Sequence, residues 1–567
     1  MRFYSFDMRY REQYCMFEHL LPLQDYEMKG GEQHGFWLIP EPLIDQVAGC
    51  DPPPLLSQCD TKQHSLEQLF SHQPRLELSN PKPIIQFNQT EVFHSLQSKS
   101  ASYNQDLKRF LYGRRLLIDE LPFSLAELHE HVRLGFIRYE SGLTKTRSHY
   151  MCNRCGNEDS RLFGHYRCFR CKETCYYCRS CIMMGRVATC TPLLSWQVAE
   201  KTRSPSLHHR LKWDGTLSIF QKKASDKLCE KVQTFFLEGK NEYSQFLIWA
   251  VCGAGKTEMV FKGIETALQQ GLRVLIATPR TDVVLELEPR LKEVFPNTII
   301  HAFYGGVDDR YAQAELVIST THQLLRFYNV FDLVIIDEVD AFPYTADKKL
   351  TYAVTKAQKA ESLSVYVTAT PNPELKSLSE RGRLETVKVA RRYHRYPLPV
   401  PELVWVGAWK KRLRFGTIPT KLRHWMIEHE KNGKQMFLFV STVKVMEDVV
   451  SLLRKEVSFS VEGVHSADPE RREKVKNFRA GKTIVLVTTT ILERGVTVKG
   501  VQVAVLGAEE QIFSESALVQ IAGRVGRSPE EPTGDVVYFN YGKTNEMVKA
   551  VTHIKEMNRL GEKELTD

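Results

Sequence analysis

The sequence predicts an α/β protein with two tandem parallel-sheet domains, preceded by a Cys-rich zinc module and an N-terminal accessory region. Beyond about residue 205, short apolar runs alternate with helical segments, which is typical of parallel sheets flanked by helices. These runs form two series, separated by a basic, Pro-broken stretch from Lys388 to Pro401. In front of them, seven of the 13 cysteines fall between Cys152 and Cys181.

The composition fits a folded protein outside the secretory class. The chain has 567 residues, of which 42% are hydrophobic and 26% charged, as in globular domains. Basic residues exceed acidic ones by 77 − 68 = 9, an excess too small at this length to indicate an anionic partner by itself. No apolar run approaches the roughly 20 residues that cross a bilayer, and the first residues lack the apolar segment of a secretory signal. We therefore expect a cytoplasmic protein.

Residues 1–145 carry no motif that can be converted into chemistry. Prolines 52–54, 81 and 83 separate short apolar stretches, and the segment from Leu125 to Ile137 has helical character. We expect an accessory region with loops.

The cysteines of the next module, 146–192, have the spacing of zinc ligands. Cys152 and Cys155 are separated by two residues and followed by Gly156, so both thiolates can meet one tetrahedral ion. A dense cysteine cluster inside a long chain without a leader is more often a metal site than a disulfide scaffold. The spacing leaves the partner pair open among Cys168 with Cys171, Cys175 with Cys178, and Cys178 with Cys181.

The module also has the composition of a surface for nucleic acid or a protein partner. Four sulfur ligands leave the ion no open position, so its expected role is structural. Aromatic and basic residues are interleaved, a combination that can stack bases and pair with phosphates. The expected basic surface consists of Arg154, Arg161, Arg167, Arg170, Arg179 and Arg186.

The two sheet domains are expected at 205–390 and 391–567. Candidate strands of the first are Phe246–Val251, Arg273–Ala277, Leu316–Ser319, Leu333–Ile336 and Val365–Thr368. Candidate strands of the second are Met436–Val440, Thr483–Val487, Val501–Leu506 and Asp535–Phe539. Parallel sheets bind ligands at the carboxyl ends of their strands, so two such domains predict a cleft between them.

A phosphate-binding loop follows the first strand. The run Ala250-Val251-Cys252-Gly253-Ala254-Gly255-Lys256-Thr257 lies between a strand and a helix, the setting that a P-loop needs. Its small residues let backbone N–H groups approach phosphate oxygens at a helix N-terminus. Lys256 would reach the β and γ phosphates, and the Thr257 hydroxyl would hold Mg²⁺. The alternative is a Gly-rich turn without a nucleotide.

Acidic residues end a second apolar strand. Leu333 to Ile336 is followed by Asp337, Glu338, Val339 and Asp340. A carboxylate at such a strand end can hold the Mg²⁺ that bridges phosphates, which is the role expected for Asp337. Glu338 beside it can orient or deprotonate the attacking water. Together with the P-loop, these residues predict nucleoside triphosphate hydrolysis.

A third element lies in the second sheet domain, where Gln520 is followed by Gly523, Arg524, Gly526 and Arg527. A transition state with charge spread over the γ-phosphoryl oxygens is stabilised by further arginines. The two arginines, three apart on one helical face, are expected to reach across the cleft. The alternative is a basic helix surface.

Together these three elements resemble the superfamily 2 helicases and translocases, whose core is two RecA-like domains. Gln221 is similar to the adenine-recognising glutamine of that superfamily. Thr278-Pro279-Arg280 and Thr320-Thr321-His322 resemble its nucleic-acid motifs, and Thr368-Ala369-Thr370 its coupling motif. The run from Glu493 to Thr497, which includes Gly495, resembles the motif that touches strand and nucleotide, although Thr497 replaces the aspartate of DEAD-box proteins.

A narrower resemblance, over about 146–567, is to the late competence protein family ComFA. It is carried by the runs 253–259 (which ends in Glu258 and Met259), 337–344 and 490–497. The resemblance implies an ATP-dependent, DNA-stimulated motor with Mg²⁺ and Zn²⁺, which drives the uptake of single-stranded transforming DNA. It implies ComFC, DprA and the membrane channel ComEC as partners, and a peripheral place at the inner face of the cell membrane. Whether the protein is an oligomer stays open.

The same resemblance selects the zinc ligands. The stretch around Cys178 and Cys181, followed by Met183-Met184-Gly185-Arg186, is similar to the second knuckle of ComFA-like proteins. It implies a site made of Cys152, Cys155, Cys178 and Cys181. Cys168, Cys171, Cys175 and Cys190 then form either a second site or ordinary thiols.

Two other functions remain alternatives. The replication-restart helicase PriA shares the theme of a cysteine module before a motor, and a preference for forked duplexes would favour it. A zinc-dependent DNA-binding adaptor with a vestigial ATPase belongs to another class, and the intact set of Lys256, Asp337, Glu338 and Arg527 weighs against it.

Overall fold

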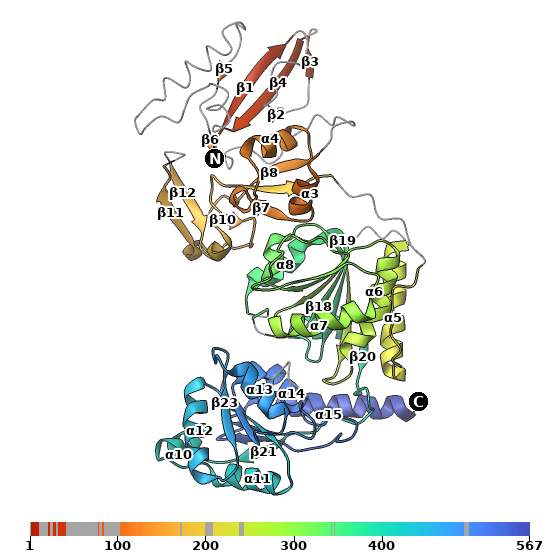
Figure 1. The fold of residues 1–567 in the computed structure, drawn as a ribbon, viewed down its shortest axis with the longest axis vertical. Coiled ribbons are helices and arrows are strands. Elements are labelled where there is room, and N and C mark those ends of the chain that lie inside the picture. Colours follow the sequence, from red (N-terminus) through yellow and green to blue (C-terminus); the bar gives the residue numbers. More distant parts are fainter. Residues whose placement is uncertain are drawn as a thin grey trace.

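Four bodies follow one another along the long axis of the molecule in the computed structural model (Figure 1). They are a set of N-terminal strands (red), a small unit that carries the cysteines (orange), and two sheet domains (green and blue). The structure describes residues 103–169, 173–198, 208–237, 243–341, 343–344, 346–492 and 498–566, and the backbone of short strands between 2 and 83. Within these residues, no helix is both long and apolar enough to span a bilayer.

The N-terminal strands form one sheet. Its centre is a long antiparallel pair, β1 (Arg2–Tyr10) with β4 (Glu32–Pro40). The shorter strands β2 (Leu21–Pro22), β3 (Glu27–Lys29), β5 (Glu77–Leu78) and β6 (Lys82–Pro83) pair with one or the other of these two.

The cysteine segment is an insertion in a small α/β unit. Strand β13 (Pro192–Trp196) follows the cysteines, yet it pairs antiparallel with β7 (Arg115–Leu117) and β8 (Ile137–Ser141), which precede them. Helix α3 (Gln105–Leu111) and helix α4 (Leu125–Arg133) pack on this three-stranded sheet around an apolar core of their own. The cysteine segment is therefore anchored at both ends to one folded body.

Helix α4 is shorter than the sequence predicts. The helix was expected to run from Leu125 to Ile137, but it ends at Arg133 and Ile137 begins β8. Gly135 has φ +80°, a left-handed conformation that stops a helix at no steric cost. The cysteine segment itself contains two hairpins, made by β9 (Leu143–Lys145) with β10 (Tyr150–Cys152), and by β11 (Phe163–Arg167) with β12 (Thr174–Cys178).

The first sheet domain is a seven-stranded parallel sheet in the order β16-β17-β15-β18-β19-β14-β20. Its inner strands are buried on both faces, which explains why they read as continuous apolar runs. In chain order the strands are β14 (Ser244–Ala250), β15 (Val274–Thr278), β16 (Ile300–Phe303), β17 (Leu316–Thr320), β18 (Phe331–Asp337), β19 (Gln358–Thr368) and β20 (Glu385–Val389). Its helices are α5 (Ile219–Leu237), α6 (Lys256–Gln269), α7 (Thr281–Val294), α8 (Lys348–Ala357) and α9 (Pro373–Glu380).

The second sheet domain is a six-stranded parallel sheet in the order β21-β26-β25-β22-β24-β23. Its strands are β21 (Glu402–Trp405), β22 (Met436–Phe439), β23 (Val461–Val464), β24 (Val485–Thr488), β25 (Gln502–Leu506) and β26 (Val536–Asn540). Its helices are α10 (Trp409–Arg414), α11 (Thr420–Lys431), α12 (Val443–Glu456), α13 (Arg471–Arg479), α14 (Glu515–Ala522) and α15 (Asn545–Thr566). The two parallel sheets confirm the predicted fold class.

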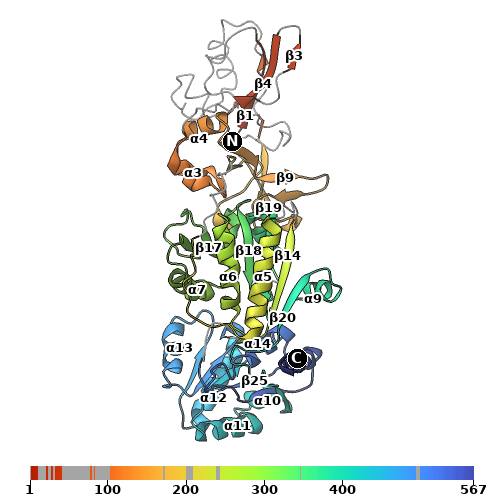
Figure 2. The ribbon, with the colours of Figure 1, turned by 90° about the vertical axis from the view of Figure 1, so that its right-hand side faces the viewer.

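The two sheet domains share an apolar core. Alternate residues of β22 point to opposite faces of the second sheet. Phe437 and Phe439 belong to the cluster that continues into the first domain, whereas Met436 and Leu438 belong to a cluster on the other face. Helices α14 and α15 lie on the side of the second domain that faces the first (Figures 1 and 2). The carboxyl ends of the first sheet therefore meet the second domain.

Candidate functional site

The P-loop connects β14 to α6 at the carboxyl edge of the first sheet. Gly253 and Gly255 have φ +78° and +71°, a left-handed conformation that glycine adopts without steric cost. A Cβ on Gly255 would lie 2.4 Å from Nε2 of Gln221. Lys256 is the first residue of α6 and Thr257 the second, so both lie at a helix N-terminus, where phosphate is favoured.

Gln221 supports the P-loop from helix α5. Its Nε2 donates to the carbonyl of Ala254 at 2.9 Å, and its Oε1 accepts from the Ser218 amide at 2.8 Å. The side chain is 5% exposed. Glu258, one residue past Thr257, forms an ion pair with Arg290 on α7. Gln221 and Glu258 thus brace the loop from two helices, in addition to the roles expected of them at the nucleotide.

The two expected catalytic carboxylates lie at the same sheet edge. Asp337 is the last residue of β18 and is paired in register with Val367 of β19, the strand beside β14. Glu338 has φ +59° although it carries a side chain, which costs on the order of 1–3 kcal/mol and is typical of functional sites. Its amide donates to the carbonyl of Val367 at 3.1 Å, which fixes the strained turn in place.

Asp340, two residues later, links both sheet domains. It accepts hydrogen bonds from Thr368 at 2.6 Å and Thr370 at 2.5 Å, in the first domain. It also accepts one at 2.6 Å from Ser516, on α14 of the second domain. The sequence placed Asp340 in a motif without assigning it a contact, because nothing in the sequence shows that Ser516 comes near. Three hydroxyl donors on one carboxylate make this a firm interdomain junction.

The second domain touches the P-loop directly through α14. Cys252 Sγ donates to Oε1 of Gln520 at 3.1 Å. A Cβ on Gly523 would lie 2.3 Å from Cβ of Cys252, so only glycine permits this approach. Gln520 is 3% exposed. The three residues place the end of α14 against the loop expected to bind phosphates.

Arg524 and Arg527 follow in a turn. The expectation that they share a helical face is wrong, because α14 ends at Ala522, Gly523 caps it, and Gly526 has φ +66°. Burial and the charges of Arg527 and Arg280 hold the pKa of Arg524 well below its usual value, while the charge of Glu338 acts in the opposite direction. Glu338 acts on the pKa of Arg527 in the same way. Both guanidinium groups therefore lie near the carboxylate expected to orient water.

The linker between the two sheets contributes a third arginine that sequence reasoning left unassigned. Arg392 is 0% exposed, and its Nη1 donates to the carbonyl of Gly526. Its Cγ lies 3.6 Å from the Cβ position of Gly253. The next amide, of Tyr393, donates to the carbonyl of Gly253 at 3.1 Å. The basic composition of the linker was the available signal.

Other predicted motif residues lie around this interface. Arg280 Nη2 donates to the carbonyl of Ile491 at 2.7 Å. His322 is followed directly by a short 3-10 helix, Gln323–Arg326. Gly495 lies outside the described residues, so its expected role stays a prediction.

The cysteine segment brings four thiols together. The sulfurs of Cys152, Cys155, Cys178 and Cys181 all lie within 4.8 Å of one another, and all four side chains are buried. Cys152 and Cys181 are 3.8 Å apart, and Cys155 and Cys178 are 3.6 Å apart. Two sulfurs bound tetrahedrally at about 2.3 Å lie roughly 3.8 Å apart, so the set fits Zn²⁺.

The extended strand β12 decides one of the pairings that spacing left open. Cys175 and Cys178 are both in β12, and residues three apart on a strand point to opposite faces. They therefore cannot share one ion, despite having two residues between them.

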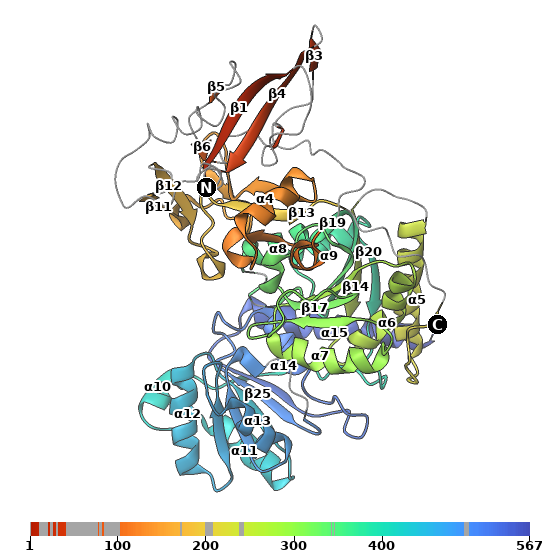
Figure 3. The ribbon, with the colours of Figure 1, turned by 45° about the horizontal axis from the view of Figure 1, so that its top comes forward.

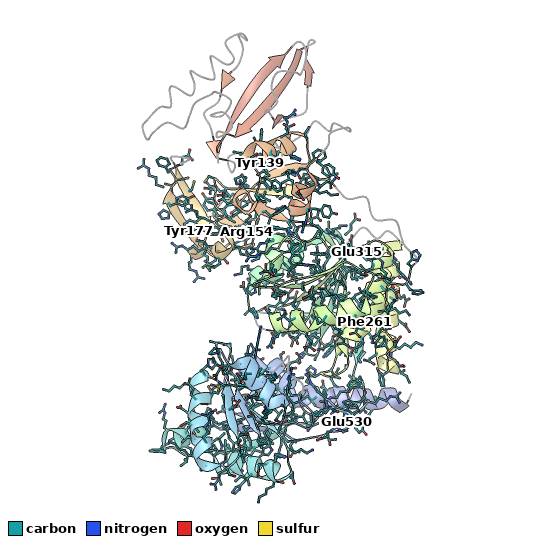
Figure 4. All side chains as sticks on the ribbon, viewed as in Figure 1. Tyr139, Arg154, Tyr177, Phe261, Glu315 and Glu530 are labelled. Atoms are coloured by element: carbon teal, nitrogen blue, oxygen red, sulfur yellow. The ribbon has the colours of Figure 1, made fainter. Side chains whose placement is uncertain are left out.

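Arg154 departs from the predicted basic surface. It is 1% exposed, and it donates to the carbonyls of Met184 and Gly185, the latter at 2.8 Å. Figure 4 shows it at the boundary between the cysteine unit and the first sheet domain, away from the outer hairpin that carries Tyr177. A guanidinium in that position holds the second knuckle together instead of facing solvent. The arginines that are exposed are Arg161, Arg167, Arg179 and Arg186, and Arg170 lies outside the described residues.

The cysteine unit is docked on helix α8 of the first sheet domain. A Cβ on Gly156 would lie 2.5 Å from the ring of Tyr352. Lys356 Nζ donates to the carbonyl of Arg154 at 2.8 Å and to that of Leu325 at 2.7 Å. Burial lowers the pKa of Lys356 to about 7. Burial strong enough to lower the pKa of an amine that bridges two backbones indicates a dry, tightly packed junction.

Comparisons with known proteins agree with this arrangement. Three family models match: the competence protein ComFA N-terminal domain at 97–195, the type III restriction enzyme res subunit at 215–373, and the helicase conserved C-terminal domain at 418–529. Competence protein ComFA of Bacillus subtilis (strain 168) is 50% identical over 470 residues, which cover 83% of this chain and 99% of that protein. ComFA of Streptococcus pneumoniae (strain ATCC BAA-255 / R6) is 36% identical over 413 residues, covering 71% of this chain and 91% of that protein.

A solved structure, S. cerevisiae Dbp5 bound to RNA and ADP BeF3, is 16% identical, with 60% of this chain and 91% of that chain covered and a TM-score of 0.43. The two ComFA relatives are matched over 99% and 91% of their own lengths. The chain therefore belongs to the ComFA family of competence proteins, and its two sheet domains form a superfamily 2 helicase-like ATPase.

Proposed function

We propose that this ATPase is a single-stranded DNA translocase that drives transforming DNA into the cytoplasm during natural competence. The observation that carries the proposal is the contact of α14 with the P-loop, where Cys252 meets Gln520 and Gly523. Arg524 and Arg527 follow Gly523 closely in the chain, so this contact supports a role for them at the phosphate loop of the other domain. Hydrolysis in such a cleft can alter how the two domains sit together.

The residues of the first domain bind the nucleotide. The backbone amides of Gly253 and Gly255, with the Lys256 ammonium, would surround the β and γ phosphates, whereas the Ala254 amide donates to the carbonyl of Val251. The Thr257 hydroxyl and the Asp337 carboxylate are oxygen donors of the kind that hold Mg²⁺, which would neutralise charge on the phosphates.

Hydrolysis draws on both domains. Glu338, held by its turn beside β18, orients the attacking water and accepts its proton. Arg524 and Arg527 stabilise the charge that spreads over the γ-phosphoryl oxygens. Neither domain has the complete set, so the rate depends on their closure.

The junction at Asp340 couples hydrolysis to movement. Thr368 and Thr370 belong to the first domain and Ser516 to the second, and all three donate to this carboxylate. A change beside Glu338 is thus transmitted to α14 within one hydrogen-bond network. Alternating grip of the strand backbone by the two domains, without reading of bases, advances the strand.

Zinc held by the first thiol site would have a structural role. Cys152, Cys155, Cys178 and Cys181 leave no open position on a tetrahedral ion. With zinc bound, these four residues would fix the knuckles that lie against α8, while the exposed arginines of the same segment remain available for DNA or a protein partner. By family resemblance, the proposed partners are ComFC, DprA and the channel ComEC, at the inner face of the cell membrane.

Steady-state ATPase assays with and without single-stranded DNA test the proposal. We expect turnover stimulated by the strand and lost in Lys256→Ala. Lys262→Ala is the matched control, because Lys262 lies on the same helix and pairs with Asp226 at the surface. Absence of turnover in the wild-type protein would instead support an adaptor with a vestigial ATPase, and a preference for forked duplexes would support a PriA-like helicase.

A further inference from the structure

A second group of thiols lies at the far end of the hairpin that carries Cys178. The sulfurs of Cys168, Cys175 and Cys190 all lie within 4.8 Å of one another, and all three side chains are buried. Cys168 follows β11, Cys175 is in β12, and Cys190 precedes β13. Three segments thus converge on one point, whereas two segments form the first site.

The distances match a shared ion better than a disulfide. Cys168 and Cys190 have their sulfurs 3.9 Å apart. Two sulfurs on a tetrahedral Zn²⁺ lie roughly 3.8 Å apart, whereas a disulfide bond is about 2.05 Å long. The described cysteines form no disulfide.

The surroundings of these sulfurs offer little apolar packing to replace a metal. Their buried cluster has one other member, Ala188, with Tyr166 and Tyr177 packed partly against it. The hairpin β11–β12 projects from the body of the cysteine unit (Figures 1 and 3). A projecting hairpin of this size needs a metal or another cross-link to hold a fixed shape.

We propose that Cys168, Cys175 and Cys190 bind a second Zn²⁺, separate from the ion of the first site. Three thiolates favour a soft divalent ion such as zinc, with the fourth position filled by a further donor. Since β12 supplies Cys175 to one ion and Cys178 to the other, the strand would be clamped on both faces. The second ion would order the outer hairpin, where Arg167 and Arg179 are exposed.

Zinc content per chain tests this inference on the full-length protein. We expect two zinc ions per wild-type chain by elemental analysis, and one in a Cys168→Ser/Cys190→Ser variant. Cys229→Ser is the control, because Cys229 is equally buried but lies on α5, outside both groups, and it should keep two. The variant should retain its ATPase activity, which shows that it folds.

One zinc per wild-type chain, unchanged in Cys168→Ser/Cys190→Ser, would overturn the inference. So would a Cys168–Cys190 disulfide found by mass spectrometry in freshly purified protein. Retention of one zinc in that variant, and its loss on further replacement of Cys152 and Cys155, would show that the two sites are separate.

A second inference concerns Arg392 and rests on the proposed nucleotide site. Its side chain is completely buried, yet Nε and Nη2 have no hydrogen-bond partner among the described residues. Nε lies 3.9 Å from the Cβ position of Gly253 in the P-loop, and Nη1 is bound to the carbonyl of Gly526, next to Arg527. Burial lowers its pKa to about 10, and the charge of Arg527 acts in the same direction.

Unpartnered N–H groups on a buried cation are costly. We infer that Arg392 binds the phosphates of ATP with these nitrogens and so joins the interdomain linker to the nucleotide. Three arginines would then surround the phosphate, one of them from the segment that must bend when the domains move.

Binding of a fluorescent ATP analogue distinguishes this role from a structural one. A hydrogen bond to a charged group contributes about 1.5–3 kcal/mol, so Arg392→Ala should weaken binding by roughly 10- to 100-fold. Arg392→Lys should recover part of the affinity. Arg391→Ala is the matched control, since Arg391 is 5% exposed but packs on Gly561 of α15.

Equal loss of affinity in Arg391→Ala and Arg392→Ala would show a structural effect and overturn the inference. Unchanged binding in Arg392→Ala, with binding lost in Lys256→Ala, would overturn it while leaving the nucleotide site intact. Unchanged binding in Lys256→Ala as well would mean that the proposed nucleotide site itself is wrong.

Discussion

Single side chains at the domain junction make contacts between the two sheet domains that no sequence motif predicts. Ser516 of the second domain donates to Asp340 at 2.6 Å and lies 2.9 Å from Thr370. Cys252, inside the P-loop, meets Gln520 of the other domain. Communication between the domains therefore depends on short polar side chains whose partners are distant in sequence.

Replacing Ser516 with alanine should uncouple the domains without emptying the nucleotide site. A hydrogen bond to a carboxylate contributes about 1.5–3 kcal/mol, so we expect DNA-stimulated turnover to fall by about tenfold or more. Binding of a fluorescent ATP analogue should change little. Ser451→Ala, an exposed position on α12, is the control. Equal turnover in both variants would contradict the coupling role.

Glu515, beside Ser516, gives the same junction a pH dependence. A hydrogen bond from His553 at 2.9 Å, together with Lys376 at 2.9 Å, lowers its pKa to about 2. Because the folded state favours the carboxylate, this stabilisation is complete above the unfolded pKa of about 4.5 and is lost as the pH falls toward 2.

Urea unfolding midpoints of the wild type and Glu515→Gln should therefore differ most at pH 7. The difference should stay constant down to about pH 4.5 and shrink below it, since protonation makes the wild type resemble the variant. A difference as large at pH 3 as at pH 7 would show that the carboxylate charge is not what stabilises this contact.

Among the secondary-structure elements, the sequence predicted the inner strands of the first sheet better than its edge strands. Leu333–Ile336 was expected to be a strand and lies within β18, because parallel strands buried on both faces are continuous apolar runs. The short strands β16 and β20 were missed, and both are edge strands of the first sheet. An edge strand is buried less evenly, so its sequence has weaker periodicity.

The residues of the candidate site also differ in how well the sequence predicts them. Local spacing was sufficient for the P-loop and for the pair of thiols at Cys152 and Cys155, since each is formed within one turn. Contacts that depend on the packing of distant elements, such as Gly526 with Arg392 or Gly156 with Tyr352, cannot be predicted from the spacing of residues along the chain. The burial of Arg154 was missed for that reason.

The docking of the cysteine unit on α8 should fail when Gly156 gains a side chain. Gly156 has φ +69°, and an added Cβ would lie 2.5 Å from the Tyr352 ring. In Gly156→Ala, the positive φ strains the backbone and the new methyl group overlaps the Tyr352 ring. We therefore expect the melting temperature to fall by roughly several degrees. Zinc content should be unchanged, because no ligand is altered. Gly433→Ala, at φ +66° with nothing within 4 Å of the added Cβ, isolates the strain. If Gly433→Ala lowers the melting temperature as much, the contact with Tyr352 does not contribute.

For the whole molecule, closure of the two sheet domains requires a close approach of α14 to the P-loop. The approach is tightest at Gly523, where an added Cβ would lie 2.3 Å from Cβ and 2.8 Å from Sγ of Cys252. A methyl group there holds the domains apart and moves Arg524 away from the phosphates. Gly523→Ala should therefore reduce ATP turnover by about 100-fold, as expected when a few kcal/mol of transition-state stabilisation are lost.

A second substitution separates this steric cause from any other effect of the alanine. Cys252→Gly removes both atoms that the new methyl group would strike, so the double variant Gly523→Ala/Cys252→Gly should recover turnover to near that of Cys252→Gly alone. Small-angle X-ray scattering with a non-hydrolysable ATP analogue and single-stranded DNA should show compaction in the wild type and the double variant, and none in Gly523→Ala. Compaction of Gly523→Ala to the wild-type extent would mean that the contact between the P-loop and α14 does not control domain closure. The catalytic role of Arg524 would then have to be tested separately from domain motion.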